Sequence, residues 1–375
     1  MNIKSLILGS ATVALATAGA QAADAIVIAE PEPVEYVRVC DVYGAGFFYI
    51  PGTETCLKIG GEFRHQIGAS ESLFGAPDIL NYHGMTDDRW NTTSRVRVVV
   101  DARSETEYGT LQGYARLQFD RADGAAASVL NHGWLSLGGF RAGWTDSAWV
   151  STPQGGRAAG GSHSDSGFHY GYHQTHLIQY NFAGSNGFFG TISAEFDDAG
   201  FTNNYTPDFV GVVGVNQGWG AAWLKVGYDE EINALGDSGF GVTAGLHYNI
   251  AGAPGSSFRL LGFYADSDNK YGVFNGTGFR AGGLGAPEWS IMASYYHQFN
   301  AQFGASLAVQ YFSDLYFAGT DINTGIDGWA LELNTVWTPV ENFVVRGELV
   351  YNQFDLPAGI DDDSVSGFIR FSRFF

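Results

Sequence analysis

The chain has 375 residues, of which 15% are aromatic and only 15% are charged, and it contains 52 glycines. Its 39 acidic residues outnumber its 19 basic ones, and this net charge of −20 argues against nucleic acid as a partner. No uninterrupted run of 20 apolar residues follows the N-terminus, which excludes membrane-spanning helices. Many aromatic residues and glycines with few charges favour one large β-barrel over two soluble domains.

The N-terminus, residues 1–22, is predicted to be a secretory signal peptide. Lys4 gives a positive start, residues 6–16 form an apolar core, and Ala20-Gln21-Ala22 is a small-residue cleavage site. Removal deletes one lysine and no acid, so the mature net charge is −21. The next residues, 23–55, begin rich in Pro and Glu and are predicted to be a periplasmic N-terminal segment.

The chain has two cysteines, Cys40 and Cys56. In the oxidising periplasm, a single disulfide that closes this short loop is the predicted state, and two free thiols are the alternative. A metal site would need more ligands than this pair supplies.

From residue 57 onward, apolar and polar residues alternate in runs that recur about every twenty residues. Sixteen strands are predicted, at 57–69, 93–103, 109–121, 128–137, 139–146, 173–183, 187–197, 207–216, 219–230, 238–250, 256–267, 287–298, 301–314, 326–338, 342–354 and 365–375. An even number places both ends of residues 56–375 on the periplasmic side of a membrane barrel. The pattern leaves the register of 128–137 and 256–267 open.

The last predicted strand ends the chain on an aromatic residue. Phe371 and Phe375 share the parity expected to face lipid, whereas Arg370 and Ser372 share the parity expected to face the lumen. A terminal apolar strand frays in a soluble domain, but in a closed barrel it pairs with the first strand. This end therefore favours a barrel in the bacterial outer membrane.

The connections between the predicted strands alternate between short and long. Every second connection is a short turn of Gly, Asn or Pro, as at Gly138-Gly139 and Gln217-Gly218. Six of the long connections together hold 21 acids and three bases: 70–92, 197–208, 229–237, 266–288, 313–327 and 354–364. Short turns on one rim and long acidic loops on the other are typical of an outer-membrane barrel.

The stretch from Val37 to Gly61, VRVCDVYGAGFFYIPGTETCLKIGG, resembles the N-terminal signature of the general porins of rhizobial alpha-proteobacteria. The signal peptide and the run EPEPVEYVRVCD are also similar to that family, and the resemblance is looser over the remaining chain. It implies a trimeric barrel that lets solutes diffuse passively. Residues 133–149 are similar to the strand, turn and strand that precede the constriction loop in this family.

The long connection from Ser147 to Tyr172 differs from the others because it is rich in Gly and Ser and nearly neutral. It contains Arg157 and Asp165, and Asp146 lies just before it. The resemblance implies that it folds into the barrel as a constriction loop, and small residues would let its backbone pack closely against the inner wall. A loop on the outer surface is the alternative.

A basic wall is predicted to line the pore opposite that loop. Its members take the lumen parity of the first three strands or of the last one: Lys58, Arg64, Arg95, Arg97, Arg103, Arg116 and Arg370. Such a wall, facing acids across the pore, would set up a transverse field that sorts dipolar solutes. Alternatively, each arginine pairs with a neighbour such as Glu62 or Asp101 and stabilises the wall.

Two further groups of residues contain side chains that can bind metal ions. His163, His169, His173 and His176 lie near the end of the long connection, and hydrogen-bonding or solvated side chains are expected there rather than a metal. The run Asp361-Asp362-Asp363 is expected to be a solvated loop tip, with divalent cations that bridge lipopolysaccharide as the alternative ligand. No metal or cofactor is predicted.

Enzyme motifs do not support a catalytic function. The sequence has no G-x-S-x-G elbow, no H-E-x-x-H helix and no P-loop. We predict an all-β fold, a 16-stranded antiparallel transmembrane barrel that acts as an outer-membrane diffusion channel for small hydrophilic solutes and ions. The resemblance adds the inward-folded constriction loop and the homotrimer. The alternatives are a channel selective for sugars or anions, a structural or adhesive surface barrel and, last, an outer-membrane enzyme.

Overall fold

The structure, a computed structural model, describes residues 38–70, 89–122, 124–155, 160–166, 168–196, 205–274, 283–356 and 363–375. The predicted signal peptide lies outside the described residues. The chain divides into two units, Met1–Arg38 and Val39–Phe375, and every described strand belongs to the second. Among the described residues, no helix has the length and apolar character needed to cross a bilayer.

In the described part of the chain, the second unit contains β-strands and the short 3-10 helix η1 (Ser185–Gly187). Its strands are β1 (Phe48–Tyr49), β2 (Cys56–Ser70), β3 (Arg89–Thr106), β4 (Gly109–Ala122), β5 (Ala125–Leu137), β6 (Phe140–Asp146), β7 (Gln174–Ala183), β8 (Phe188–Phe196), β9 (Asp208–Gln217), β10 (Gly220–Asp229), β11 (Gly239–Asn249), β12 (Ser257–Ala265), β13 (Leu284–Gln298), β14 (Phe303–Phe317), β15 (Gly328–Val340), β16 (Phe343–Phe354) and β17 (Asp363–Phe374).

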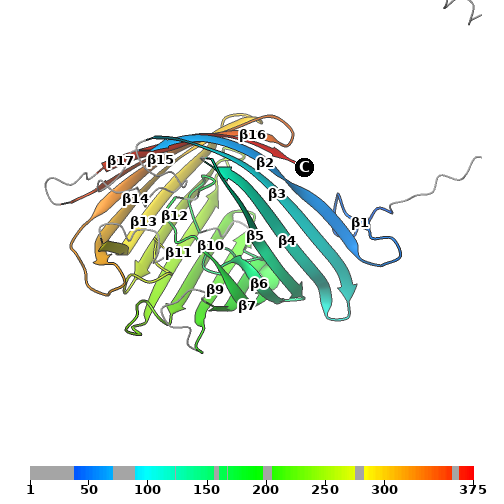
Figure 1. Cartoon of the computed structure of the whole chain (residues 1–375), viewed down its shortest axis with the longest axis horizontal. Coiled ribbons are helices and arrows are strands. Elements are labelled where there is room, and N and C mark those ends of the chain that lie inside the picture. The colour runs from blue at the N-terminus through cyan, green and yellow to red at the C-terminus, as the bar shows by residue number, and fades with distance from the viewer. Residues whose placement is uncertain are drawn as a thin grey trace, which may run out of the picture. The chain divides into compact units, whose positions relative to one another are not determined.

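Strands β2 to β17 form a closed antiparallel barrel. Each pairs with its neighbour in sequence, and β17 returns to pair with β2 from Ser366↔Ser70 to Phe374↔Glu62. Figure 1 shows this closure, with β17 in red beside β2 in blue. Closure leaves no unpaired strand edge, which a bilayer could not satisfy with hydrogen bonds. The predicted sixteen-stranded antiparallel barrel is confirmed.

Strand alternation separates an apolar outer face from a polar inner face. On β2, Ile59 and Phe63 are each 53% exposed on the outer face, whereas Glu62 and Gln66 are each 5% exposed on the inner face. In the membrane, these outer side chains contact lipid instead of water. Their exposure in the isolated barrel is therefore the arrangement expected of membrane-spanning strands.

The sequence leaves the register of 128–137 and 256–267 open, and the structure gives a separate reason in each of the corresponding strands, β5 and β12. In β5, Arg116 pairs with His132 but Leu117 pairs with Leu130, so Asn131 is an extra residue that shifts the alternation by one. In β12, Leu261 is fully buried inside the barrel while Leu260 is 39% exposed outside. From Leu260 to Ala265 both faces of β12 are mostly apolar, so this part of its sequence does not alternate.

A small apolar cluster ties the N-terminal turn to the barrel. Cys40 and Cys56 form a disulfide, as predicted, with their Cα atoms 6.0 Å apart. Both cysteines are buried with Phe47. The short strand β1 pairs with the start of β2 through Phe48↔Leu57 and Tyr49↔Cys56.

The connection from β12 to β13 differs from the expectation of an exposed acidic loop. Its described part, Asp266–Phe274, contains fully buried Tyr271 and Asn269 at 1% exposure. A Cβ added to Gly227, on the inner face of β10, would lie 2.3 Å from the Tyr271 ring. This part of the connection therefore packs inside the barrel, because its aromatic side chains bury apolar surface there.

Candidate functional site

The connection between β6 and β7, Ser147–His173, is called the inward segment from here on. Its first residues are fixed to β8 through Glu195, a fully buried carboxylate. The Ser147 hydroxyl donates to Glu195 at 2.8 Å, and the Ala148 backbone N–H donates to it at 3.0 Å. Hydrogen bonds to a buried charge are among the stronger kinds, so this carboxylate sets where the inward segment enters the lumen.

The next contact of the inward segment is a buried lysine on β10. The Lys225 ammonium donates to the carbonyl of Trp149 at 2.7 Å and to that of Val150 at 3.2 Å. Lys225 is fully buried, so these carbonyls replace its hydration. The backbone of the segment is therefore held against β10 by a side chain that reaches inward from the wall.

Further along, the inward segment contacts β12 and β15. The Ser162 hydroxyl donates to Glu332 of β15 at 2.8 Å. The guanidinium of Arg259, on β12, donates to the carbonyls of Gly161 at 2.9 Å and Ser162. His163 shares hydrogen bonds with wall hydroxyls on β12 and β13. These contacts extend the attachment across half the barrel circumference.

Asp165 brings the inward segment to the strands that close the barrel. Arg370 of β17 donates to Asp165, and the Arg64 guanidinium on β2 lies 4.0 Å from the same carboxylate. Partial removal from water raises the pKa of Asp165, but the guanidinium groups of Arg370, Arg346 and Arg64 outweigh this and hold it below its usual range. Asp165 is therefore a charged partner for this part of the wall.

The returning part of the inward segment is buried through His169. Its ring contacts Phe274 and Phe312 at centroid distances of 5.4 and 5.5 Å and meets Asn352 of β16 at 3.2 Å. Gln310 of β14 donates to its backbone carbonyl at 2.8 Å. Burial lowers the pKa of His169 to about 4, so the ring is neutral at neutral pH.

The buried part of the β12–β13 connection, Asp266–Phe274, is called the bracing segment. The Tyr271 hydroxyl lies 3.1 Å from both Glu195 and Asp208 and donates toward these carboxylates. Lys270 forms an ion pair with Asp208 at 2.6 Å. The bracing segment thus meets the same Glu195 that anchors the start of the inward segment.

The inward and bracing segments also touch directly. A Cβ on Gly171, whose φ is +74°, would lie 2.2 Å from the Gly272 carbonyl oxygen, so glycine is required at this contact. Trp149 and Tyr271 pack edge to face at 5.8 Å. With inner side chains of β8 to β16, they form a continuous buried apolar cluster. This cluster fills the part of the lumen nearest those strands.

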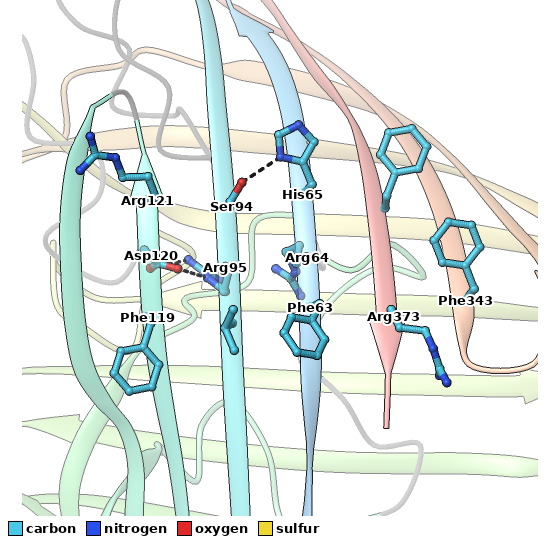
Figure 2. A pocket seen from close by; sticks show the side chains of 12 residues that line it. Phe63, Arg64, His65, Ser94, Arg95, Phe119, Asp120, Arg121, Phe343 and Arg373 are labelled. Atoms are coloured by element: carbon cyan, nitrogen blue, oxygen red, sulfur yellow. Dashed lines mark hydrogen bonds and ion pairs between the residues drawn. The ribbon is translucent and has the colours of Figure 1, made fainter. Parts of the chain in front are cut away.

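On the opposite side, inner side chains of β2–β4 and β17 gather basic groups. Five of the seven predicted basic residues are brought together there: Arg64, Arg95, Arg97, Arg116 and Arg370. Arg64 and Arg95 are directly opposite across β2 and β3. Arg64 pairs with Glu62, and Arg95 pairs with Asp120, each at 2.7 Å; Figure 2 shows the second pair.

Arg97 and Arg116 have weaker acidic partners than Arg64 and Arg95. Arg97 donates to Gln118 at 2.9 Å, and its nearest contact with Glu62 is 3.6 Å. Arg116 contacts the Asn131 amide and the His132 imidazole rather than a carboxylate. Positive charge on this wall is therefore only partly neutralised by carboxylates.

Lys58 and Arg103 do not join this group. Lys58 donates to the Ala45 carbonyl at 3.1 Å, under the N-terminal turn. Arg103 pairs with Asp101 at 2.6 Å and lies 5.1 Å from the Phe47 ring centroid. Both residues have the inner parity, but they lie at the short-turn end, where β2 begins and β3 ends.

The remaining predicted site residues have separate positions. Asp146 accepts hydrogen bonds from Tyr172 at 3.0 Å and Gln174 at 3.1 Å, at the start of the inward segment. Arg157 lies outside the described residues, as do Asp361 and Asp362. Asp363 begins β17.

The four histidines do not converge on one point. His163 lies between wall serines, His169 is buried among aromatic rings, and His173 approaches Glu195 at 3.7 Å. His176 is exposed and packs against Trp144 at 5.0 Å. Within the described ranges no group of three or more His, Cys, Asp or Glu side chains is arranged to hold a metal ion.

Several residues that shape the site were not singled out from the sequence: Glu195, Lys225, Arg259, Glu332, Arg346 and Glu348. All have the inner parity of a predicted strand, so alternation alone could have nominated them. Arg346 donates to Asn334 on the neighbouring strand, whereas the other five have partners far away in sequence on the inward segment. Strand periodicity carries no information about such contacts.

The family model of the porin subfamily matches residues 24–366. The chain belongs to the porin subfamily. Porin Omp2b of Brucella suis biovar 1 is 33% identical to it over 406 residues, which covers 100% of both chains. The recognised porin family is thus confirmed, and this porin is a channel in the form of a multi-pass β-barrel in the outer membrane.

Solved structures share the fold of this porin at low sequence identity. The outer-membrane channel DcaP of Acinetobacter baumannii aligns with a TM-score of 0.63 at 15% identity, covering 86% of this chain and 99% of that one. The trimer form of in-vitro folded OmpT from Vibrio cholerae aligns with a TM-score of 0.55 at 13% identity, covering 86% and 100%. These likenesses support the barrel architecture.

The contacts of the Tyr271 hydroxyl predict that its removal increases the noise of the channel current. Tyr271→Phe keeps the ring but removes a hydrogen bond to a carboxylate, which is worth about 1.5–3 kcal/mol. We expect more open-channel current noise in single-channel recordings, because the inward segment is held less firmly. Tyr264→Phe, on the lipid side of β12, is the matched control and should record like the unmodified protein. Equal noise in all three proteins would contradict the bracing role.

Proposed function

We propose that this porin lets small hydrophilic solutes and ions diffuse passively between the inward segment and the wall formed by β2–β6. The observation that carries this proposal is the one-sided attachment of the inward segment. Its contacts follow the inner faces of β8 to β17, where the apolar cluster lies, and reach β2 at Arg64, 4.0 Å from Asp165. Arg95 and Arg97 on the other side keep 23% and 19% of their side-chain surface exposed.

The exposed wall suits hydrated solutes. Arginine stays charged at any physiological pH, and its planar group orders water and polar solutes near the wall. A sixteen-stranded barrel is wide enough for an aqueous lumen around an inserted loop. Diffusion through such a passage needs no catalytic group, so we assign no catalytic residue.

The charge distribution gives opposing contributions to ion selectivity. The net charge of −20 and the acid-rich long connections concentrate cations near the mouth. This long-range effect is screened when the Debye length falls to about 8 Å at physiological ionic strength. Arg97 and Arg116 act at contact distance and favour anions. Cation preference should therefore be weak at low salt and should fall or reverse as salt rises.

Planar-bilayer recordings test the function and the role of the wall together. The purified protein should give steady conductance, and an Arg97→Gln, Arg116→Gln double variant should shift reversal potentials toward cations at every salt concentration. Lys58→Gln removes one positive charge at the short-turn end and should shift them less. Absence of conductance would refute a diffusion channel. Strong anion selectivity that does not change with salt in the unmodified protein would refute the contribution of the acid-rich connections at the mouth to ion selectivity.

The outer face of the first and last strands supports a homotrimer, which we also propose. A groove of about 530 Å³ there is lined by phenylalanines and by His65, Ser94, Arg121 and Arg373; Figure 2 shows its residues. His65 and Ser94 form a 3.0 Å hydrogen bond on the lipid-side parity. Polar groups facing hydrocarbon are costly, whereas small and polar side chains pack well between subunits in lipid. The rest of the outer face would contact outer-membrane lipid and lipopolysaccharide.

A bulky substitution distinguishes a subunit contact from a lipid contact. Ser94→Trp should prevent close packing and make the protein run as a monomer on mild detergent gels. Ala244→Trp places the same ring on the outer face of β11, where lipid accommodates it, and should leave the trimer intact. A trimer that persists with Ser94→Trp would place the contact elsewhere, and an unmodified protein that is always monomeric would refute assembly.

A further inference from the structure

Arg141, near the start of β6, is part of an aromatic stack on the inner wall. Its guanidinium carbon lies 3.9 Å from the centroid of the Trp134 ring. Trp134 in turn stacks on Tyr114 at 4.9 Å with an interplanar angle of 14°. Tyr114 and Trp134 are directly opposite across β4 and β5, so the stack crosses three neighbouring strands.

Register places Arg141 on the lumen side. It lies opposite Ser136 on β5 and Gln179 on β7, and Gln179 is 3% exposed inside the barrel. The same row continues to Gln112 of β4, which shares the inner parity of Arg116. Arg141 follows the Gly138-Gly139 turn by two residues, so it lies toward the short-turn rim, which faces the periplasm in this class of barrel.

Arg141 differs from other inward-facing arginines in its partners. In the described part of the chain, each of the others donates to a carboxylate, amide, imidazole or carbonyl group: Arg64, Arg95, Arg97, Arg103, Arg116, Arg259, Arg346 and Arg370. Arg141 has no such acceptor among the described residues, and its Nε is buried without a hydrogen-bond partner. A guanidinium has five N–H donors and no acceptor, so the terminal donors of Arg141 are left for water or a solute in the lumen.

The surroundings of Arg141 leave its charge uncompensated. Its direct neighbours across the sheet, Ser136 and Gln179, are neutral. Asp101, the carboxylate in the row of Tyr114, is already held by Arg103 at 2.6 Å and by Gln112 at 2.9 Å. Asp146 is 3.8 Å from His132 and bonded to Tyr172 and Gln174. Among the residues that the structure describes, a mobile anion therefore meets no competing acid at Arg141.

We propose that Arg141, with its plane fixed by Trp134, is a docking site for the carboxylate of small organic acids passing through the channel. The planar guanidinium matches a carboxylate with two parallel hydrogen bonds. Stacking on Trp134 reduces the rotamer freedom lost on binding. The adjacent aromatic rings suit an acid with a flat apolar part. This inference rests on the proposed diffusion function and names one class of its solutes.

Weak binding is what such a site requires. A solute must be attracted strongly enough to enter the site and weakly enough to leave it. Because Arg141 lies toward the periplasmic rim, docking there would follow passage by the inward segment. The site would thereby favour organic acids over neutral solutes of equal size without closing the channel to ions.

Benzoate is the probe, applied to channels in planar bilayers at 0.1 M potassium chloride. In the unmodified protein we expect current noise and a partial, saturating loss of conductance as benzoate rises through the millimolar range. Arg141→Gln should raise the half-blocking concentration about tenfold or more, since the charge-assisted pair is worth more than one tenfold step. Benzyl alcohol, which lacks the carboxylate, should produce neither effect.

Two further variants separate the site from general wall charge. Arg141→Lys keeps the charge but loses the planar fork, so potassium chloride conductance should persist while benzoate block weakens. Arg103→Gln removes an arginine of the same rim that already has Asp101 as partner, and block should persist. Equal block in the unmodified protein and in both Arg141 variants would overturn the proposal, as would a conducting unmodified channel that benzoate does not affect. A protein that never conducts would instead refute the diffusion function.

Discussion

The absence of hydrogen-bonding partners for the backbone inside a bilayer is the constraint on which this structure depends. Pairing of β17 with β2 satisfies it by removing both sheet edges. Closure in turn forces every inward side chain into one shared lumen, where Arg370 on the last strand meets Gln66 on the first at 2.8 Å. The basic wall and the attachment points of the inward segment both follow from that closure.

The lumen has two different halves, one filled by packed side chains and one open to water. Near β8 to β16, buried carboxylates and Lys225 hold the inward segment, and the bracing segment covers it with aromatic rings. Glu195 is shared by both segments, so their positions are coupled. Near β2–β6, the wall keeps charged groups in contact with water. A channel that conducts hydrated solutes and also has a firm constriction needs both halves.

Much of this fold follows from the sequence, because lipid on one side and water on the other impose a period of two on each strand. The pattern fails at Asn131, where one extra residue shifts the parity, and at Leu261, which faces inward and belongs to the buried apolar cluster. Parity also gives the face of a residue but not its depth along the barrel axis, so the sequence does not distinguish Lys58 and Arg103 from the wall arginines. The partners of Glu195 and Lys225 lie on a distant segment, and no local pattern encodes them.

Cysteine accessibility tests most directly whether solutes pass along β2–β6 while the other half is filled. The native Cys40 and Cys56 are bonded to each other, so single cysteines can be introduced at inward-facing positions. A charged, water-soluble thiol reagent should react with Val99→Cys on β3 and reduce the channel current. It should leave Ser290→Cys and Ala308→Cys unmodified, because these positions are 2% and 1% exposed beneath the two segments. Comparable reaction at all three positions would contradict the account.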